Sequence, residues 1–378
     1  ACTSRTVGNF LTGTKPELGF MTMDGQEVFK FAVRKVPESV MELLQRTGTK
    51  KEDIKYYVLH QANERIIEAA ARRLKEPMEK FPMTISQFGN TSTASIPLLL
   101  DDMIRKDMLK RGDKIIMPRN VHRSAINALV LCGAVPVYVN PGVDPQLGIA
   151  LGMSLADVER AIEANPDAKA VLVNNPTYYG VCSDLRSIVK LAHAHGMRVL
   201  ADEAHGTHFS FSDALPVSAM AAGADMAAVS MHKSGGSLTQ SSMLLIGPAM
   251  SEGYVRAVIN LTQTTSASYL LLASLDISRR NLALRGQETM ARVAALAEYA
   301  RAEINAIGDY DAFSKERING TSFFDFDITK LSVHTLGLGL AGIEVYDLLR
   351  DEYGIQIEFG DIGNILAYVS VGDREREI

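Results

Sequence analysis

The sequence has no tryptophan and only three cysteines among its 378 residues. Cys2, Cys132 and Cys182 lie far apart in the chain, so they form neither a metal-binding spacing nor a disulfide framework. We therefore expect no metal site and a reducing, cytoplasmic location. No apolar run approaches the 18 or more residues that a membrane-spanning helix needs, and the first residues do not resemble a signal peptide. We expect no membrane partner.

The chain also lacks an excess of basic residues, with 39 Lys and Arg against 44 Asp and Glu and a net charge of -5. This balance gives no electrostatic argument for a nucleic-acid partner. The Gly-Lys dipeptide of a nucleotide-binding phosphate loop is absent, so residues 202–205, which spell the acidic box of certain helicases, do not predict an ATPase. Hydrophobic residues make up 47% of the chain, enough for a sizeable core, and the length predicts two or three domains.

Two polar residues stand where buried strands are expected to end. Asp202 closes the apolar run that begins at Arg198, and Lys233 closes the run that begins at Ala227. In open α/β sheets, ligands bind beyond the carboxyl ends of the strands. An acid and a lysine placed there suit pyridoxal 5'-phosphate (PLP), because the lysine can form a Schiff base while the acid holds the protonated pyridine nitrogen.

From about residue 115 onward, apolar runs alternate with helical patterns. Strands are expected at 134–139, 170–173, 198–201, 226–230 and 243–246, and helices at 155–163 and 184–195. Such alternation is typical of a mostly parallel sheet with crossover helices, an α/β fold. A long helical pattern at 269–307 precedes a partial α+β tail, with strands near 321–327, 355–359 and 365–371 and a helix near 342–353.

Residues 337–342 fit the glycine spacing of a dinucleotide fingerprint. Too few residues follow to complete that kind of domain. We expect a glycine-rich turn that opens a helix instead.

The first part of the chain has a different pattern. Helices are expected at about 27–46 and 64–74, a short strand at 56–59, and another helix from the Gly89–Ser95 segment to about 109.

This first part resembles the C-terminal part of β-ketoacyl-acyl-carrier-protein synthase III, a thiolase-fold enzyme of fatty acid initiation. The motifs that carry the resemblance are residues 23–30, 60–63 and 89–92. It implies that His60 and Asn90 match two catalytic residues of that family and that Gln61 and Arg65 lie at a docking position for acyl carrier protein. The family's cysteine nucleophile lies upstream of everything present here. Acyl transfer is thus an alternative function that lacks its nucleophile.

The second part resembles the major domain of the Orn/Lys/Arg decarboxylases, PLP enzymes of the aspartate-aminotransferase fold (fold type I). The resemblance rests on five motifs, at 118–124, 174–180, 202–208, 230–236 and 262–266. It implies that Lys233 is the Schiff-base lysine, that Asp202 contacts the pyridinium nitrogen, and that His122 and Ala204 lie against the two ring faces. Ser230 and His232 would reach the phosphate. The remaining implied cofactor contacts are His205 and Thr177, together with Thr264 or Thr265, one of which would reach a neighbouring subunit's phosphate.

The implied reaction is the α-decarboxylation of a basic amino acid. Arginine, lysine and ornithine are equally compatible with the motifs. The resemblance also implies a homodimer or a higher homo-oligomer.

The two parts meet at Arg111–Ile116. We expect a synthase III fragment at 1–111, an N-terminally truncated PLP-binding domain at 112–310, and a partial small α+β domain at 311–378. On this view the chain is a chimera of natural or artefactual origin, truncated at both ends. Its phosphate-binding helix N-terminus would be missing, so activity would be impaired, and an inactive product is a further alternative.

Overall fold

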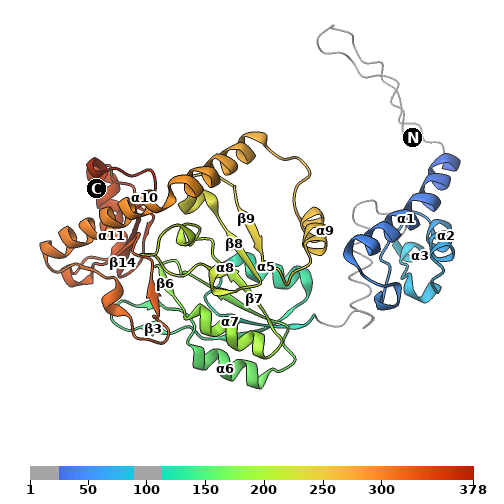
Figure 1. The fold of residues 1–378 in the computed structure, drawn as a ribbon, viewed down its shortest axis with the longest axis horizontal. Coiled ribbons are helices and arrows are strands. Elements are labelled where there is room, and N and C mark those ends of the chain that lie inside the picture. Colours follow the sequence, from blue (N-terminus) through green and yellow to red (C-terminus); the bar gives the residue numbers. More distant parts are fainter. Residues whose placement is uncertain (1–24, 89–111) are drawn as a thin grey trace, which may run out of the picture. The chain divides into compact units, whose positions relative to one another are not determined.

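The computed structural model describes residues 25–88 and 112–378 (Figure 1). The chain divides into two compact units. The first comprises Ala1–Lys110 with the short segment Gly253–Val258, and the second comprises Arg111–Glu252 with Ile259–Ile378.

The first unit is helical. Its elements are α1 (Gly25–Thr47), η1 (Lys51–Asp53), α2 (Glu64–Leu74), η2 (Met78–Lys80) and α3 (Ile85–Phe88). The helices expected at 27–46 and 64–74 are confirmed. A small core holds the unit together, and in it the rings of Tyr57 and Phe81 stack with centroids 4.8 Å apart.

The strand expected at 56–59 is wrong. Those residues have no strand partner among the residues described. The Tyr57 N–H instead donates to the Lys80 carbonyl at 2.7 Å, and the Tyr57 ring is buried. Burial of one aromatic side chain explains the apolar pattern without a strand.

The second unit is built on a six-stranded sheet with the order β2-β1-β5-β7-β8-β9. Its strands are β1 (Lys114–Pro118), β2 (Val135–Val139), β5 (Ala170–Asn174), β7 (Arg198–Asp202), β8 (Met226–Val229) and β9 (Met243–Ile246). All pairs are parallel except β8–β9. The expected mostly parallel α/β sheet is confirmed.

Helices connect these strands. They are α5 (Arg123–Cys132), α6 (Leu155–Ala164), α7 (Leu185–Ala194) and α8 (Ala219–Ala222), and α6 and α7 lie side by side below the sheet in the view of Figure 1. Each of these two helices begins at a side-chain cap: Ser154 accepts from the Asp157 N–H, and Asp184 accepts from the Ser187 N–H. Such caps satisfy N–H groups that have no partner within the helix.

After α9 (Glu252–Thr262), the helix α10 (Tyr269–Ile307) runs for 39 residues. It leads to an antiparallel sheet with the order β10-β12-β14-β13. The elements of this last region are β10 (Asp311–Ala312), η6 (Lys315–Arg317), β12 (Lys330–His334), η7 (Leu336–Leu338), α11 (Gly342–Tyr353), β13 (Phe359–Gly360), β14 (Asn364–Tyr368) and η8 (Glu375–Glu377). The glycine-rich turn does open a helix at Gly342, as expected.

The remaining elements are short. They comprise the strand pairs β3 (Val143–Asp144) with β4 (Ile149–Ala150) and β6 (Val181–Cys182) with β11 (Asp325–Phe326), and the single turns η4 (Phe209–Phe211) and η5 (Met231–Gly235). Among the helices of the described ranges, none is both long and apolar enough to cross a bilayer.

Candidate PLP site

Three neighbouring parallel strands end at one edge of the large sheet. Asp202, the last residue of β7, is in register with Asn174 on β5 and with Ala228 on β8. Lys233 follows β8 within η5, a single π-helical turn. Short π-helical segments occur often at functional sites. Of the two polar residues that the sequence singled out, Asp202 therefore lies at the end of β7, and Lys233 lies beyond the end of the adjacent strand β8.

His205 connects Lys233 to a second lysine. The Lys233 Nζ atom lies 3.1 Å from His205 Nε2, and the Lys330 Nζ atom lies 3.0 Å from His205 Nδ1. Lys330 opens β12 in the antiparallel sheet and is fully buried, whereas Lys233 is exposed. The sequence analysis missed Lys330. The alternation of residues 330–334 was a usable strand signal, but nothing in it marked the lysine as part of a site.

Burial changes the acid–base behaviour of both partners of this bridge. Burial, together with the nearby amines of Lys330 and Lys233, lowers the pKa of His205 to about 2. It also lowers the pKa of Lys330 to about 7, although Asp327 and Glu358 oppose the shift. His205 is therefore a neutral imidazole at physiological pH.

Two tyrosines enclose the bridge. The Lys330 Nζ atom lies 3.7 Å from the centre of the Tyr368 ring, and the Tyr368 hydroxyl donates to the His205 carbonyl at 3.0 Å. The Tyr178 ring meets His205 edge-on, with centroids 4.7 Å apart, and its hydroxyl donates to Glu358. These two rings exclude water from the buried end of the bridge, where Lys330 lies.

The acids at the end of β7 have separate roles. The Asp202 Oδ1 atom accepts from the Ala204 N–H at 3.2 Å, and its half-buried carboxylate keeps further acceptor capacity. Glu203 is buried, and its Oε1 atom accepts from the Ala219 N–H at the start of α8. Burial raises the pKa of Glu203 to about 8. Glu203 therefore serves the fold, whereas Asp202 is available to a ligand.

The residues of this edge fit PLP by their chemistry. A lysine amine matches the aldehyde, a carboxylate with free acceptor capacity matches the ring N–H, and hydroxyl and imidazole groups match the phosphate. In addition, the Thr207 Oγ1 atom is buried and has no hydrogen-bond partner among the described residues. Thr207 packs against η5, the turn that contains Lys233. A Cβ atom built on Gly235 of that turn would lie only 3.3 Å from the Thr207 methyl group.

Several residues that are predicted to contact the cofactor also form hydrogen bonds within the protein. His122 caps α5, and its Nδ1 atom accepts from the Ser124 N–H at 3.2 Å. His232 Nδ1 lies 3.0 Å from the Ser241 carbonyl, and the Thr177 hydroxyl accepts from the Val181 N–H. Ser230 precedes η5 and makes no capping bond through its side chain. Contact of these residues with a cofactor stays a prediction.

Thr264 is exposed, and its hydroxyl accepts from the Ser266 N–H in a local turn. This bond uses the hydroxyl as an acceptor only, so its proton can still be donated. The predicted role of Thr264 at a neighbouring subunit also stays a prediction.

In the first unit, His60 and Arg65 are exposed. Gln61 is buried, and its amide donates to the Leu59 carbonyl and accepts from the Thr84 N–H, both at 2.9 Å. Asn90 lies outside the described residues, so the pairing of His60 with Asn90 remains a prediction. Docking of a carrier protein at Gln61 and Arg65 remains one too, and the structure uses the Gln61 side chain to join two loops.

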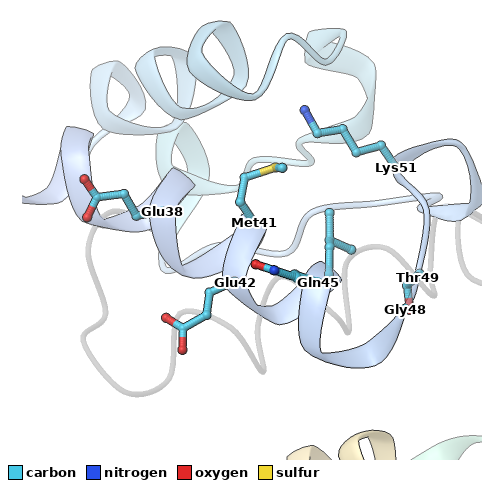
Figure 2. Close-up of a pocket in the computed structure, with 8 residues that line it drawn as sticks. Glu38, Met41, Glu42, Gln45, Gly48, Thr49 and Lys51 are labelled. Atoms are coloured by element: carbon cyan, nitrogen blue, oxygen red, sulfur yellow. The ribbon is translucent and has the colours of Figure 1, made fainter.

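The first unit also has an open hollow between α1 and the turn that follows it (Figure 2). Its lining includes Glu38, Met41, Gln45 and Lys51. None of the predicted site residues in the described ranges lines it. Within residues 25–88 and 112–378, no group of three or more His, Cys, Asp or Glu side chains is arranged to hold a metal ion.

Two family profiles match the chain in succession. Residues 44–118 match the C-terminal domain of 3-oxoacyl-[acyl-carrier-protein] synthase III, and residues 100–377 match the major domain of Orn/Lys/Arg decarboxylase. The matches overlap at 100–118, which contains the junction expected at 111–116. The chain therefore joins segments of two unrelated families, as the motifs predicted.

Individual relatives divide in the same way. An arginine decarboxylase of Halalkalibacterium halodurans is 48% identical over 268 residues, which are 71% of this chain and 55% of that protein. A β-ketoacyl-acyl-carrier-protein synthase III of Clostridium novyi is 49% identical over 117 residues, 31% of this chain and 36% of that protein. The chain thus spans about half the length of the decarboxylase relative.

The fold agrees with the sequence matches. The crystal structure of a lysine decarboxylase from Francisella novicida superposes with a TM-score of 0.61 at 20% identity, covering 71% of this chain and 44% of that one. An alanine–glyoxylate aminotransferase from Nostoc superposes with a TM-score of 0.56 over 71% of this chain and 73% of that one. The second unit has the architecture of PLP enzymes of fold type I.

Proposed function

This chain belongs to the Orn/Lys/Arg decarboxylase family through residues 100–377, and we propose that it decarboxylates a basic amino acid with PLP bound at Lys233. Its ancestry is that of a PLP-dependent carboxy-lyase. The observation that carries the proposal is that Asp202 ends β7 while Lys233 follows the end of the adjacent parallel strand β8.

Each group of the cofactor has a candidate partner here. Lys233 would hold the aldehyde carbon, Asp202 the ring nitrogen, and Ser230 with His232 the phosphate. His122 and Ala204 would lie against the two ring faces. When bound, PLP withdraws the electron pair that a departing carboxylate leaves behind.

The chain's own residues supply binding, orientation and proton positions. Asp202 would keep a proton on the ring nitrogen, because its second oxygen is not used by Ala204. His205 is uncharged above about pH 2, so it orients Lys233 by hydrogen bonding and adds no positive charge. The rings of Tyr178 and Tyr368 limit the access of water to the Lys330 amine.

Arginine is the first substrate to test, because the relatives at 45% to 48% identity over about 70% of this chain are named arginine decarboxylases. The experiment supplies purified protein with PLP and carboxyl-labelled arginine, lysine or ornithine and measures released CO2. We expect release from arginine that Asp202→Ala abolishes. An absence of release from all three substrates would reject the activity and would favour an inactive product.

A homo-oligomer is part of the proposal. Helix α5 has no fully buried residue, and Val130 and Leu131 at its end are 79% and 84% exposed. Tyr269 and Leu270, at the start of α10, are 84% and 79% exposed. Exposed apolar side chains on these two helices favour contact with a partner, and a second copy of the chain is the partner that we propose for them.

A further inference from the structure

The bridge from Lys233 through His205 to Lys330 limits which ring nitrogen of His205 can carry a proton. Each ring nitrogen faces one lysine nitrogen, Nε2 facing Lys233 at 3.1 Å and Nδ1 facing Lys330 at 3.0 Å. An ammonium group has three N–H donors and no lone pair, and a neutral imidazole has one N–H and one lone pair. The ring can therefore accept from only one ammonium group, and its N–H needs a lysine that is an amine.

Burial decides which of the two lysines is the amine. Lys330 is fully buried, whereas Lys233 is exposed. Taking an ammonium group out of water is costly, so a buried lysine gives up its proton more readily than an exposed one. Burial lowers the pKa of Lys330 to about 7, although Asp327 and Glu358 oppose the shift. At pH 8 Lys330 is thus mostly an amine, and its lone pair is available to His205 Nδ1.

We propose that Lys330 is a positioning residue that accepts the Nδ1–H of His205 as an amine and so fixes His205 Nε2 as a hydrogen-bond acceptor for Lys233. The consequence for catalysis rests on the proposed function, in which Lys233 binds the cofactor. The count of donors and acceptors along the bridge does not depend on the cofactor.

An acceptor at His205 Nε2 orients Lys233 without occupying its lone pair. The Lys233 nitrogen can donate an N–H to Nε2 both as an ammonium group and as an amine, and in the amine the lone pair is then directed elsewhere. In the opposite tautomer, the Nε2–H would donate to that lone pair. A nucleophile needs its lone pair free to attack a carbonyl carbon. The tautomer that Lys330 selects therefore suits attack by Lys233.

The surroundings of His205 leave the tautomer as its one variable. The Tyr368 hydroxyl donates to the His205 carbonyl at 3.0 Å, and the Tyr178 ring meets the imidazole edge-on with centroids 4.7 Å apart. Burial, with the amines nearby, lowers the pKa of His205 to about 2, so the ring does not become doubly protonated at neutral pH. The ring is held in place and uncharged, and only the position of its single proton can differ.

The tautomer can be measured without cofactor, by NMR of protein labelled with nitrogen-15 in its histidine rings. A ring nitrogen that carries a proton and one that has a lone pair differ widely in chemical shift. The signals of His205 are those that disappear in His205→Phe. His334, on the same strand as Lys330, is the internal control, because its Nδ1 atom lies 3.0 Å from Asn364 Oδ1. We expect the parent at pH 8 to carry the His205 proton on Nδ1.

Substitutions of Lys330 distinguish an acceptor from a cation. Lys330→Gln keeps an acceptor oxygen and should leave the His205 proton on Nδ1. Lys330→Arg has donors only and should move the proton to Nε2. Lys330→Met has neither and should give a mixture of the two tautomers. The signals of His334 should stay unchanged in all three variants. A Lys330 that acted as a positive charge would give the opposite order, with Arg like the parent and Gln unlike it.

The same variants predict the rate at which PLP attaches to Lys233, measured at pH 8 by borohydride trapping and peptide mass spectrometry. Lys330→Gln should stay within about twofold of the parent, because its hydrogen bond to His205 replaces the original one. Lys330→Arg should be slower by roughly three- to tenfold, since a hydrogen bond to the Lys233 lone pair must first break.

The outcomes that would overturn the proposal are specific. One is a parent protein with the His205 proton on Nε2, and another is a tautomer that is unchanged in Lys330→Arg. If Lys330→Arg does not fold, an unchanged tautomer in Lys330→Met overturns the proposal equally. Failure of PLP to attach to Lys233 in the parent would contradict the proposed function and leave the tautomer result standing.

Discussion

The Nζ atom of Lys330 lies 3.0 Å from the Nδ1 atom of His205, although 125 positions separate the two residues in the chain. The contact joins the antiparallel C-terminal sheet to the edge of the large sheet where Asp202 and Lys233 stand. Residues of both sheets therefore form the candidate site. The second unit must therefore fold as a whole before the site exists.

The charge state of Glu203 should make stability depend on pH. Burial raises the pKa of Glu203 to about 8 from an ordinary value of 4.5. The folded state thus holds this proton more tightly than the unfolded state, and stability should fall as the pH rises from about 5 to 8. Glu203→Gln keeps the acceptor for the Ala219 N–H and should remove this loss, worth a few kcal/mol at about 1.4 kcal/mol per pKa unit.

Urea denaturation at pH 5, 6.5 and 8 measures the effect. The difference in unfolding free energy between Glu203→Gln and the parent should grow steadily in favour of the variant. Asp213→Asn, at an exposed position nearby in sequence, is the control and should show no such trend. Parallel pH curves for the parent and Glu203→Gln would disprove the assignment.

The buried pair of His208 and Asp327 should be costly to break. The two side chains are 3.2 Å apart and almost fully buried. Burial pushes the pKa of Asp327 upward, but the charge and hydrogen bond of His208 hold it below its usual value. Asp327→Asn removes the buried carboxylate that faces His208, so this substitution should cost about 3 kcal/mol or more.

The double variant Asp327→Asn/His208→Gln distinguishes a pair from a packing defect. It should recover part of the stability lost in Asp327→Asn, as measured by chemical denaturation. Losses that simply add would show that the two side chains are not coupled.

The exposed apolar residues of α5 and α10 predict self-association. Leu131→Ser combined with Leu270→Ser should convert an oligomer to a monomer in size-exclusion chromatography with light scattering. The control is Ile362→Ser, which removes an equally exposed side chain, 82% accessible, on the loop before β14. A parent protein that is already monomeric, or an oligomer unaffected by the double variant, would rule out this surface as the interface.

The elements that the sequence predicted well are those whose periodicity reflects burial within one segment. The strands β5, β7, β8 and β9 are short apolar runs between turn residues, and α2 and α10 have the bounds expected of them. Asp202 and Lys233 could be recognised because a polar residue that ends a buried strand has a defined place in a parallel sheet.

The rest depended on contacts between distant segments. Lys330 reads as an ordinary polar residue at the start of a strand, and only the packing of β12 buries it beside His205. Tyr57 produced the opposite error, since a run of apolar residues can be buried in a loop as well as in a strand. The local sequence predicts neither the burial of Lys330 beside His205 nor the burial of Tyr57 in a loop, because each depends on which distant segments pack against the residue.

The most direct measurement is the chemical identity of the residue that PLP modifies. Purified protein is incubated with PLP, reduced with borohydride, digested and mapped by mass spectrometry. The account predicts a pyridoxyl adduct on Lys233 that disappears in Lys233→Ala, while Asp202→Asn retains the adduct and shifts its absorption before reduction. An adduct on Lys330 instead, or no adduct above that on exposed Lys190, would contradict the central claim that this sheet edge is a PLP site.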